Sequence, residues 1–339
     1  MTSVEVLNVK VFIIHASFMD VRKQRIESLI TSLSEKNEDV AFSFEYINEY
    51  DPVAIKQDDI AAKVSLTKQN NGELYDSLIR NMHINQLSNS LKHALAVEKA
   101  SKMESCPDMF IILEDDVLYG DDVMTRLVDV VKMVAKDPEI DIMFLGLPSL
   151  VPIPPSDKPT FRKVSEFFRM FPCCDSYIFT KDCLKKMLPK VYPIKYTQNI
   201  QLSWIAEECK LKCLMTTPNV FLDGSKYGAY LSAVDPNSKL VFNPEFNKLA
   251  QIVAKGHTSK YTPEEEKTID AEFETIKFRN HPDVMHLAAL YNMAKGDYKK
   301  AESILDNIYG IITQNGCIIN GDTEFLRTYA RLYKHTQDA

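Results

Sequence analysis

The sequence predicts an α/β protein in which a mixed sheet carries helices on its faces and is followed by an all-helical appendage. Up to residue 242, apolar runs of strand length alternate with segments whose apolar residues recur at helical spacing. Beyond residue 243 the strand-like runs disappear and helical spacing dominates. A length of 339 residues also fits two domains. We therefore expect an α/β domain over 1–242 and a helical domain over 243–339.

The expected sheet begins with two strands joined by a helix. LNVKVFIIH (7–15) is a β-branched apolar run, and AFSFEYI (41–47) alternates between apolar and polar residues. Residues 17–36 between them have helical spacing. The remaining strand-like runs are 109–115, 140–146, 175–180 and 211–217, and the remaining helical segments are 84–103, 121–135, 183–188 and 200–208.

Two stretches of this domain are expected to be loops. Residues 48–80 are polar with few periodic signals, and five prolines between Pro148 and Pro159 forbid regular structure. Loops of this length are usually functional. We expect both to frame a cleft for an acceptor molecule.

The helical domain is expected to contain helices over 264–278, 283–294, 298–312 and 324–335. Residues 287–308 resemble one tetratricopeptide repeat, with small and aromatic residues at Ala289, Gly296, Tyr298, Ala301 and Leu305. Because a solenoid needs about three such units, a helical cap is favoured over a repeat array. The tail is also the expected place for a protein partner or for self-association.

Composition and charge limit the class of protein. The chain is 45% hydrophobic and 26% charged, which is typical of a globular protein. Its 40 basic and 47 acidic side chains leave a net charge of −7, so no basic field is available to bind a nucleic-acid backbone. No stretch approaches 18 consecutive apolar residues, so no membrane span is expected.

The cysteines and the N-terminal segment predict a cytoplasmic protein. The seven cysteines are an odd number and form no CxxC pair, which favours reduced, buried thiols over disulfides or a zinc site. The apolar stretch near the N-terminus is interrupted by Asn8 and Lys10 and lacks a basic leading region, unlike a secretory signal.

Three consecutive acids are the sharpest feature of the sequence. Glu114, Asp115 and Asp116 end the apolar run at 109–115. Three neighbouring carboxylates repel one another, and Mg²⁺ or Mn²⁺ would remove that repulsion because both favour oxygen ligands. In open α/β sheets ligands bind outside the carboxyl ends of strands. A helix cap is the alternative, but a cap needs only one acid, so we favour a metal site.

An ordered series of motifs accompanies these acids. They are VKVFIIHASFMDVRKQRI (9–26), LSNSLKHALAVEKA (87–100), FIILEDDV (110–117), IDIMFLG (140–146), DSYIFTKDCLKKML (175–188) and GAYLSAVDPNS (228–238). Over about 9–240 the chain resembles glycosyltransferase family 25, which includes lipooligosaccharide and collagen galactosyltransferases. Asp20 and Arg22 match the family's Asp-x-Arg segment, and His93 matches its Ser-His pair, whereas Lys92 replaces the serine.

The resemblance implies a GT-A fold, a nucleotide-sugar donor that is UDP-linked, and a Mn²⁺ or Mg²⁺ cofactor. Asp116 is the first expected metal ligand, with Glu114 beside it and His257 completing the coordination shell. Glu114 and Asp115 are also expected at the donor ribose.

Further donor contacts are expected from His15, Ser17 and Arg22 after the first strand, and from His93. Two alternatives stay open: Arg22 would be a solvated arginine at a helix start, and His93 would be a core histidine with its hydrogen bonds satisfied.

The general base is the least defined part of the site, because an inverting transfer needs a carboxylate near the acceptor hydroxyl. The family has an acid after the segment 191–204, where this chain has Asn199 and Gln201. Ala233 stands where the family's closing aspartate would be, so Asp235 and Asp223 are the remaining candidates.

Two functions follow from this pattern. The first is a metal-dependent transferase that moves a hexose, galactose or glucose, from a UDP-sugar to a hydroxyl of a glycan or protein, with inversion. The second is a non-catalytic scaffold that retains the fold and acts through its helical tail. The intact acidic motif favours the enzyme, and the missing family acids favour the scaffold.

Overall fold

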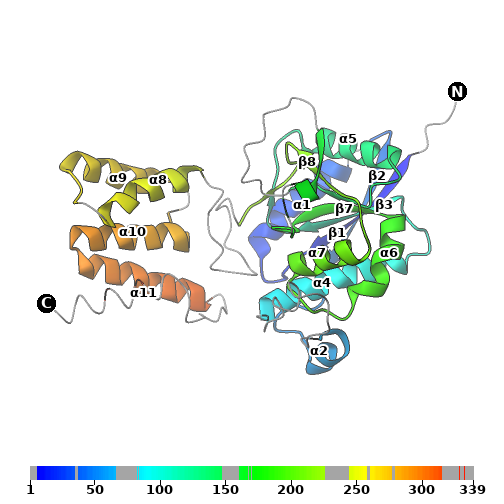
Figure 1. Cartoon of the computed structure of the whole chain (residues 1–339), viewed down its shortest axis with the longest axis horizontal. Helices are drawn as coiled ribbons and strands as arrows, with labels where there is room; N and C mark the ends of the chain where they lie inside the picture. The colour runs from blue at the N-terminus through cyan, green and yellow to red at the C-terminus, as the bar shows by residue number, and fades with distance from the viewer. Residues whose placement is uncertain are drawn as a thin grey trace. The chain divides into compact units, whose positions relative to one another are not determined.

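A computed structural model describes the chain in twelve parts. They are 6–34, 37–65, 82, 84–146, 160–166, 168, 170–225, 244–257, 260–276, 279–314, 328 and 332. The chain divides into two compact units, Met1–Asp223 and Gly224–Ala339 (Figure 1). The first is α/β and the second is helical wherever it is described, which confirms the predicted fold class. The domain boundary expected at residue 242 lies outside the described residues and stays a prediction.

A seven-stranded mixed sheet forms the centre of the first unit, in the order β2-β1-β3-β7-β5-β8-β6. Its strands are β1 (Leu7–Ile14), β2 (Val40–Ile47), β3 (Met109–Glu114), β5 (Ile142–Phe144), β6 (Thr160–Lys163), β7 (Ser176–Thr180) and β8 (Cys213–Thr217). β1 pairs in parallel with both β2 and β3, and β5 pairs in parallel with β8. β7 and β6 run antiparallel to their neighbours. A separate short ladder joins β4 (Val117–Leu118) to β9 (Leu222–Asp223).

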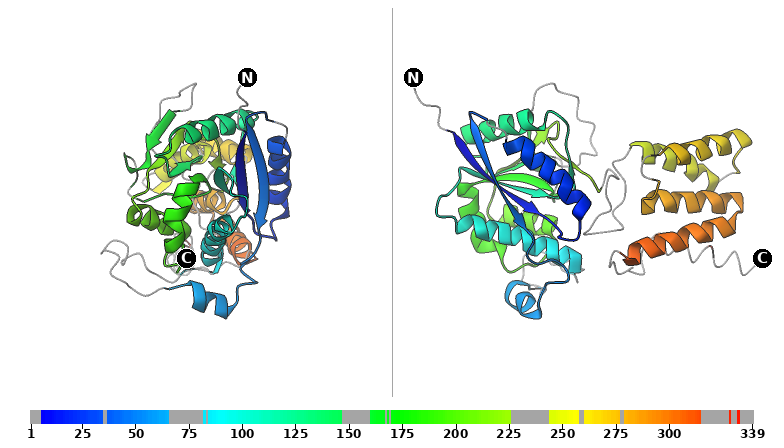
Figure 2. Two further views of the ribbon diagram at one scale, coloured as in Figure 1. Left: turned by 90° about the vertical axis from the view of Figure 1, so that its right-hand side faces the viewer. Right: turned by 180° about the vertical axis from the view of Figure 1, so that it is seen from behind.

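Alternating apolar residues of the strands build a core on each face of the sheet. In β1, Val9, Val11 and Ile13 belong to one buried cluster, and Phe12 and Ile14 belong to the other. One face is covered by α1 (Asp20–Ser34) and α5 (Val123–Lys136), and the other by α4 (Ile84–Ser101), α6 (Lys181–Val191) and α7 (Gln198–Glu208) (Figure 2). The unit is therefore a three-layer α/β/α structure.

The second unit contains α8 (Pro244–Ala254), the short helix η2 (Lys255–His257), α9 (Pro263–Thr275), α10 (Pro282–Lys295) and α11 (Tyr298–Gln314). α9 begins with a capping box in which Thr262 and Glu265 bind each other's backbone amides. Gly296 ends α10 in the left-handed region, at φ 83°. Ala289, Ala301 and Leu305 share a buried cluster. The resemblance to a tetratricopeptide repeat stays a prediction.

Several elements differ from the sequence-based expectations. α2 (Gln57–Lys63) lies inside the stretch expected to be irregular. Because none of its residues is buried, its sequence shows no apolar residues at helical spacing. The edge strand β6 is exposed or half-buried throughout and therefore lacks an apolar run. β4, β9 and α8 were also not expected. The proline-rich loop 148–159 lies outside the described residues, and of the expected helix 324–335 only Thr328 and Leu332 are described, both helical.

Among the helices that the structure describes, none is both long and apolar enough to span a lipid bilayer.

Candidate functional site

The site lies where the order of the sheet reverses. β1 is flanked by β2 on one side and β3 on the other, and all three run parallel. The chain leaves β1 through α1 on one face and enters β3 from α4 on the opposite face. Such a switch point opens a crevice outside the carboxyl ends of the two central strands. His15 follows β1 at this edge, and Glu114, Asp115 and Asp116 end or follow β3.

Asp115 fastens the loop after β1 to the end of β3. Its Oδ2 lies 2.8 Å from Nδ1 of His15 and accepts the backbone N–H of Ala16 at 3.1 Å, while its Oδ1 accepts from Arg22 at 2.8 Å. Burial opposes ionisation, but the hydrogen bond with His15 and the charge of Arg22 outweigh it and lower the pKa of Asp115. Both carboxylate oxygens are thus engaged by protein groups.

Asp116 has the opposite environment, although it is the next residue. It is buried, and the guanidinium of Arg22 lies 3.7 Å from its Oδ2. Its Oδ1 has no hydrogen-bond partner in the part of the chain that is described. Burial raises the pKa of Asp116 well above its usual range; Arg22 opposes this rise, whereas Asp223 adds to it. A buried carboxylate oxygen without a partner is costly unless something else binds it.

Arg22 is buried rather than solvated at the start of α1. It is 5% exposed, and its guanidinium binds Asp115 and faces Asp116. Burial lowers the pKa of a guanidinium, but attraction from Asp116 and Asp115 outweighs burial and raises it. The structure therefore removes the solvated alternative, while contact between Arg22 and a donor stays a prediction.

Glu114 is held from one side by α4. Its Oε1 accepts from Nδ2 of Asn89 at 3.1 Å and lies 3.1 Å from Nε2 of His93. Nδ1 of His93 lies 3.2 Å from the Tyr177 hydroxyl, and the two rings stack. These contacts favour the alternative in which His93 is a satisfied core group that orients Glu114. The Glu114 side chain remains 20% exposed, so it can still contact a ligand.

Ser17 belongs to a second polar group beneath the same loop. Its backbone N–H donates to Oδ2 of Asp51 at 3.1 Å, and its hydroxyl donates to the same oxygen. The Lys92 ammonium donates to Oδ1 of Asp51 and, at 2.5 Å, to the carbonyl of His15. Lys92 therefore holds the β1–α1 loop. The role of Asp51 could not be predicted from the sequence, because no periodic signal marks the polar stretch around it.

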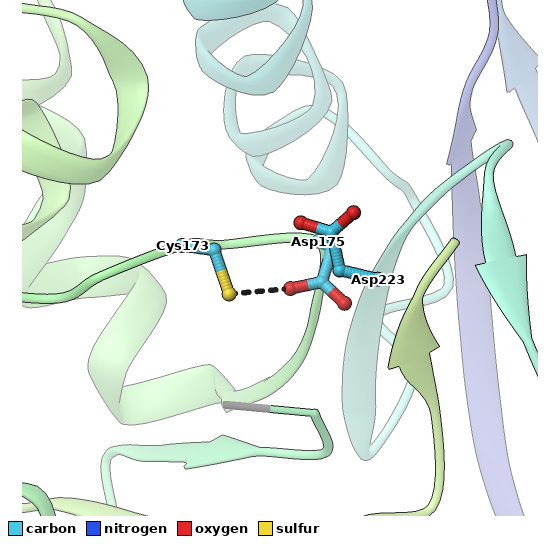
Figure 3. Close-up of side chains that lie close together, drawn as sticks. All are labelled: Cys173, Asp175 and Asp223. Atoms are coloured by element: carbon cyan, nitrogen blue, oxygen red, sulfur yellow. Dashed lines mark hydrogen bonds between the residues drawn. The ribbon is translucent and has the colours of Figure 1, made fainter. Parts of the chain in front are cut away.

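Asp223 is brought beside Asp116 by the short β4–β9 ladder, in which it pairs with Val117. It also gathers with Cys173 and Asp175 (Figure 3). One ligand atom from each of the three residues lies within 4.8 Å of the others. Asp223 is one of the candidate bases expected from the sequence. Asp175 and Cys173 were not expected at the site, since a lone acid and a thiol before a strand form no motif.

The roles expected for Asp235 and His257 stay predictions. Asp235 lies outside the described residues. His257 ends the helix η2 in the second unit, and its side chain is not described. Asn199 and Gln201 both make hydrogen bonds within the fold. Asn199 donates to the carbonyl of Phe171, and Gln201 accepts from the backbone amide of Lys195.

Comparisons with known proteins find structural but not sequence similarity. No family model and no curated protein matches the chain. One matching solved structure is a glycosyltransferase involved in glycosylation of the major capsid of PBCV-1, with 10% identity and a TM-score of 0.29 over 52% of this chain and 61% of that chain. Another is apo mouse xyloside xylosyltransferase 1, with 10% identity and a TM-score of 0.30 over 62% of this chain and 84% of that chain. TM-scores this low carry no argument about fold or function.

Proposed function

We propose that the first unit is a cation-dependent glycosyltransferase that uses a UDP-linked sugar and transfers a hexose, with inversion, to a hydroxyl of a glycan or protein. The observation that carries this proposal is the unpartnered, buried Oδ1 of Asp116 at the switch point of the sheet. Nucleotide ligands are favoured at such a position. The carboxylates of the site would repel an anionic ligand, such as the diphosphate of a nucleotide sugar, unless a cation accompanies it.

The carboxylate oxygens of the site fit a divalent cation, because Mn²⁺ and Mg²⁺ favour oxygen ligands of this kind. Asp116 would hold the cation, with Glu114 next to it. When bound, the cation supplies positive charge to the diphosphate of the donor and to the leaving nucleotide. Arg22, which is bound to Asp115, lies 3.7 Å from Asp116, and His93 holds Glu114 at 3.1 Å. Asp223 and Asp235 are the two candidates for the base that accepts the acceptor's proton.

The proposal predicts that Asp116→Asn abolishes Mn²⁺-dependent UDP binding, because it removes the charge on the oxygen that would bind the cation. Calorimetric titration of UDP with and without Mn²⁺ measures the effect, and UDP release from UDP-galactose and UDP-glucose measures turnover. Asp121→Asn is the control, because Asp121 is an exposed acid five residues further on. Unchanged UDP affinity in Asp116→Asn, or no UDP binding by the native protein, would contradict the proposal.

A non-catalytic nucleotide-sugar-binding protein is the second candidate. It is favoured by the structural roles of Asn199 and Gln201, which leave no acid at the family's position. UDP binding with Mn²⁺ but no UDP release with any donor, and no effect of Asp235→Asn, would select it.

A further inference from the structure

Cys173, Asp175 and Asp223 come from two distant parts of the chain. Cys173 and Asp175 directly precede β7, and Asp223 ends β9. All three are buried, and their ligand atoms lie within 4.8 Å of one another (Figure 3). The Cys173 thiol donates to Oδ1 of Asp175 at 2.9 Å. The sulfur and two carboxylates are therefore close enough to share one small cation.

An independent observation at Asp116 points to a ligand at this place. Asp223 pairs with Val117, the residue after Asp116, and its negative charge adds to the rise in the pKa of Asp116. Asp116 is buried, and its Oδ1 has no hydrogen-bond partner among the described residues. Burying several carboxylates together is unfavourable unless positive charge joins them.

We propose that Asp175, Asp223 and the sulfur of Cys173 bind one divalent cation beside Asp116, and that the sulfur makes the site prefer Mn²⁺ to Mg²⁺ and Co²⁺ to both. The inference rests on the proposed function only for the use of the cation, not for its location. Mg²⁺ favours an all-oxygen shell, whereas thiolate ligands select softer transition metals, and affinity rises from Mn²⁺ to Co²⁺. On binding, the cation replaces the thiol proton, which is released to solvent.

This assignment also separates the roles of the two candidate bases. Asp223 becomes a cation ligand rather than the base, because its carboxylate lies with that of Asp175 and the thiol of Cys173.

Cobalt titration of the full-length, reduced protein tests the sulfur ligand without reference to activity. A cobalt–thiolate bond gives a charge-transfer absorption band in the near ultraviolet, which oxygen ligands do not give. We expect the band in the native protein and its loss in Cys173→Ser, together with at least about tenfold weaker Co²⁺ binding. Binding of Mg²⁺ should change little. Cys174→Ser and Cys106→Ser are controls for a neighbouring buried thiol and an exposed thiol, and both should keep the band.

Asp175→Asn and Asp223→Asn should weaken Co²⁺ and Mg²⁺ alike, because each removes an oxygen ligand of either metal. Cadmium NMR of the native protein reports a sulfur ligand without any substitution, so the test does not depend on folding of a variant. Absence of cobalt binding, cobalt binding without the band, or a band that survives Cys173→Ser would overturn the inference. A cobalt band without UDP binding would contradict only the proposed function, and Mn²⁺-dependent UDP binding without a band would contradict only the sulfur ligand.

Discussion

Two neighbouring aspartates show that the environment of a residue, rather than its type, sets its role. Asp115 has both oxygens bound by protein groups, and its pKa is lowered. Asp116 keeps one oxygen without a partner, and its pKa is raised. Arg22 faces both. Asp115 is thus suited to hold the loop after β1, and Asp116 is suited to bind a ligand.

Replacing Arg22 should test the different roles of Asp115 and Asp116. Arg22→Ala leaves buried carboxylates without their counter-charge, which costs about 3–5 kcal/mol of unfolding free energy. If a cation binds Asp116, Mn²⁺ should raise the Tm of this variant more than that of the native protein. Arg25→Ala is the control, because Arg25 lies on the same helix but stacks on Tyr119, a contact that contributes only about 0.5–1 kcal/mol. Equal losses in the two variants would contradict the assigned role of Arg22.

The sequence identifies the acids of the site but not the residues that complete it. The sequence predicts a site at Glu114, Asp115 and Asp116 because these acids come at the end of an apolar strand. It does not predict the contribution of Asp175 and Cys173, because they form a group only with Asp223, which is about fifty residues away and comes close through the tertiary fold. The same holds for Asp51, which acquires its role only when Lys92 and Ser17 reach it.

At the scale of elements, the close approach of β5 and the segment before β9 is set by one glycine. A Cβ on Gly146 would lie 2.5 Å from the carbonyl oxygen of Phe221 and 2.8 Å from Oγ of Ser176. The backbone of Phe221 must shift to admit a methyl group, and Asp223 follows two residues later.

Gly146→Ala should therefore destabilise the first unit by about 1–3 kcal/mol and weaken cation binding. Urea unfolding and the cobalt titration measure the two effects. In Gly120→Ala the new Cβ would meet only a carboxylate oxygen of Asp122, at 3.2 Å, so that variant should behave as the native protein does. A fully stable Gly146→Ala would show that the two segments can separate without cost.

Elements with a continuous apolar face were predictable, and elements formed through tertiary contacts were not. α5 buries Leu127, Val131 and Val134 along one face, and this period is visible in the sequence. β4 and β9 have only two residues each, and each exists because the other lies beside it. No local pattern could reveal such a ladder.

At the scale of the whole molecule, each unit has its own buried clusters, so each can respond separately to pH. His281 in the second unit caps α10, where its Nδ1 accepts the amide of Asp283 at 3.2 Å. Burial lowers the pKa of His281 from 6.5 to about 4. Between these values the unfolded chain binds more protons than the folded one, so stability falls as the pH is lowered.

The second unit should lose up to about 3 kcal/mol of stability between pH 6.5 and pH 4 through this histidine. His281→Asn keeps a capping side chain but cannot titrate, so its stability should depend less steeply on pH. Hydrogen exchange of peptides from α10 and α11, measured across this range, follows the second unit alone. The same pH dependence in both proteins would exclude His281 as the source.

The β4–β9 ladder also determines which changes of sequence the position of Asp223 can tolerate. Because two paired residues fasten Asp223 beside Asp116, the carboxylate is anchored before the chain enters its second unit. Changes confined to the helices beyond residue 243 would leave both that anchor and Asp235, a candidate base, unaltered. The position of Asp223 is thus independent of the helices that follow it.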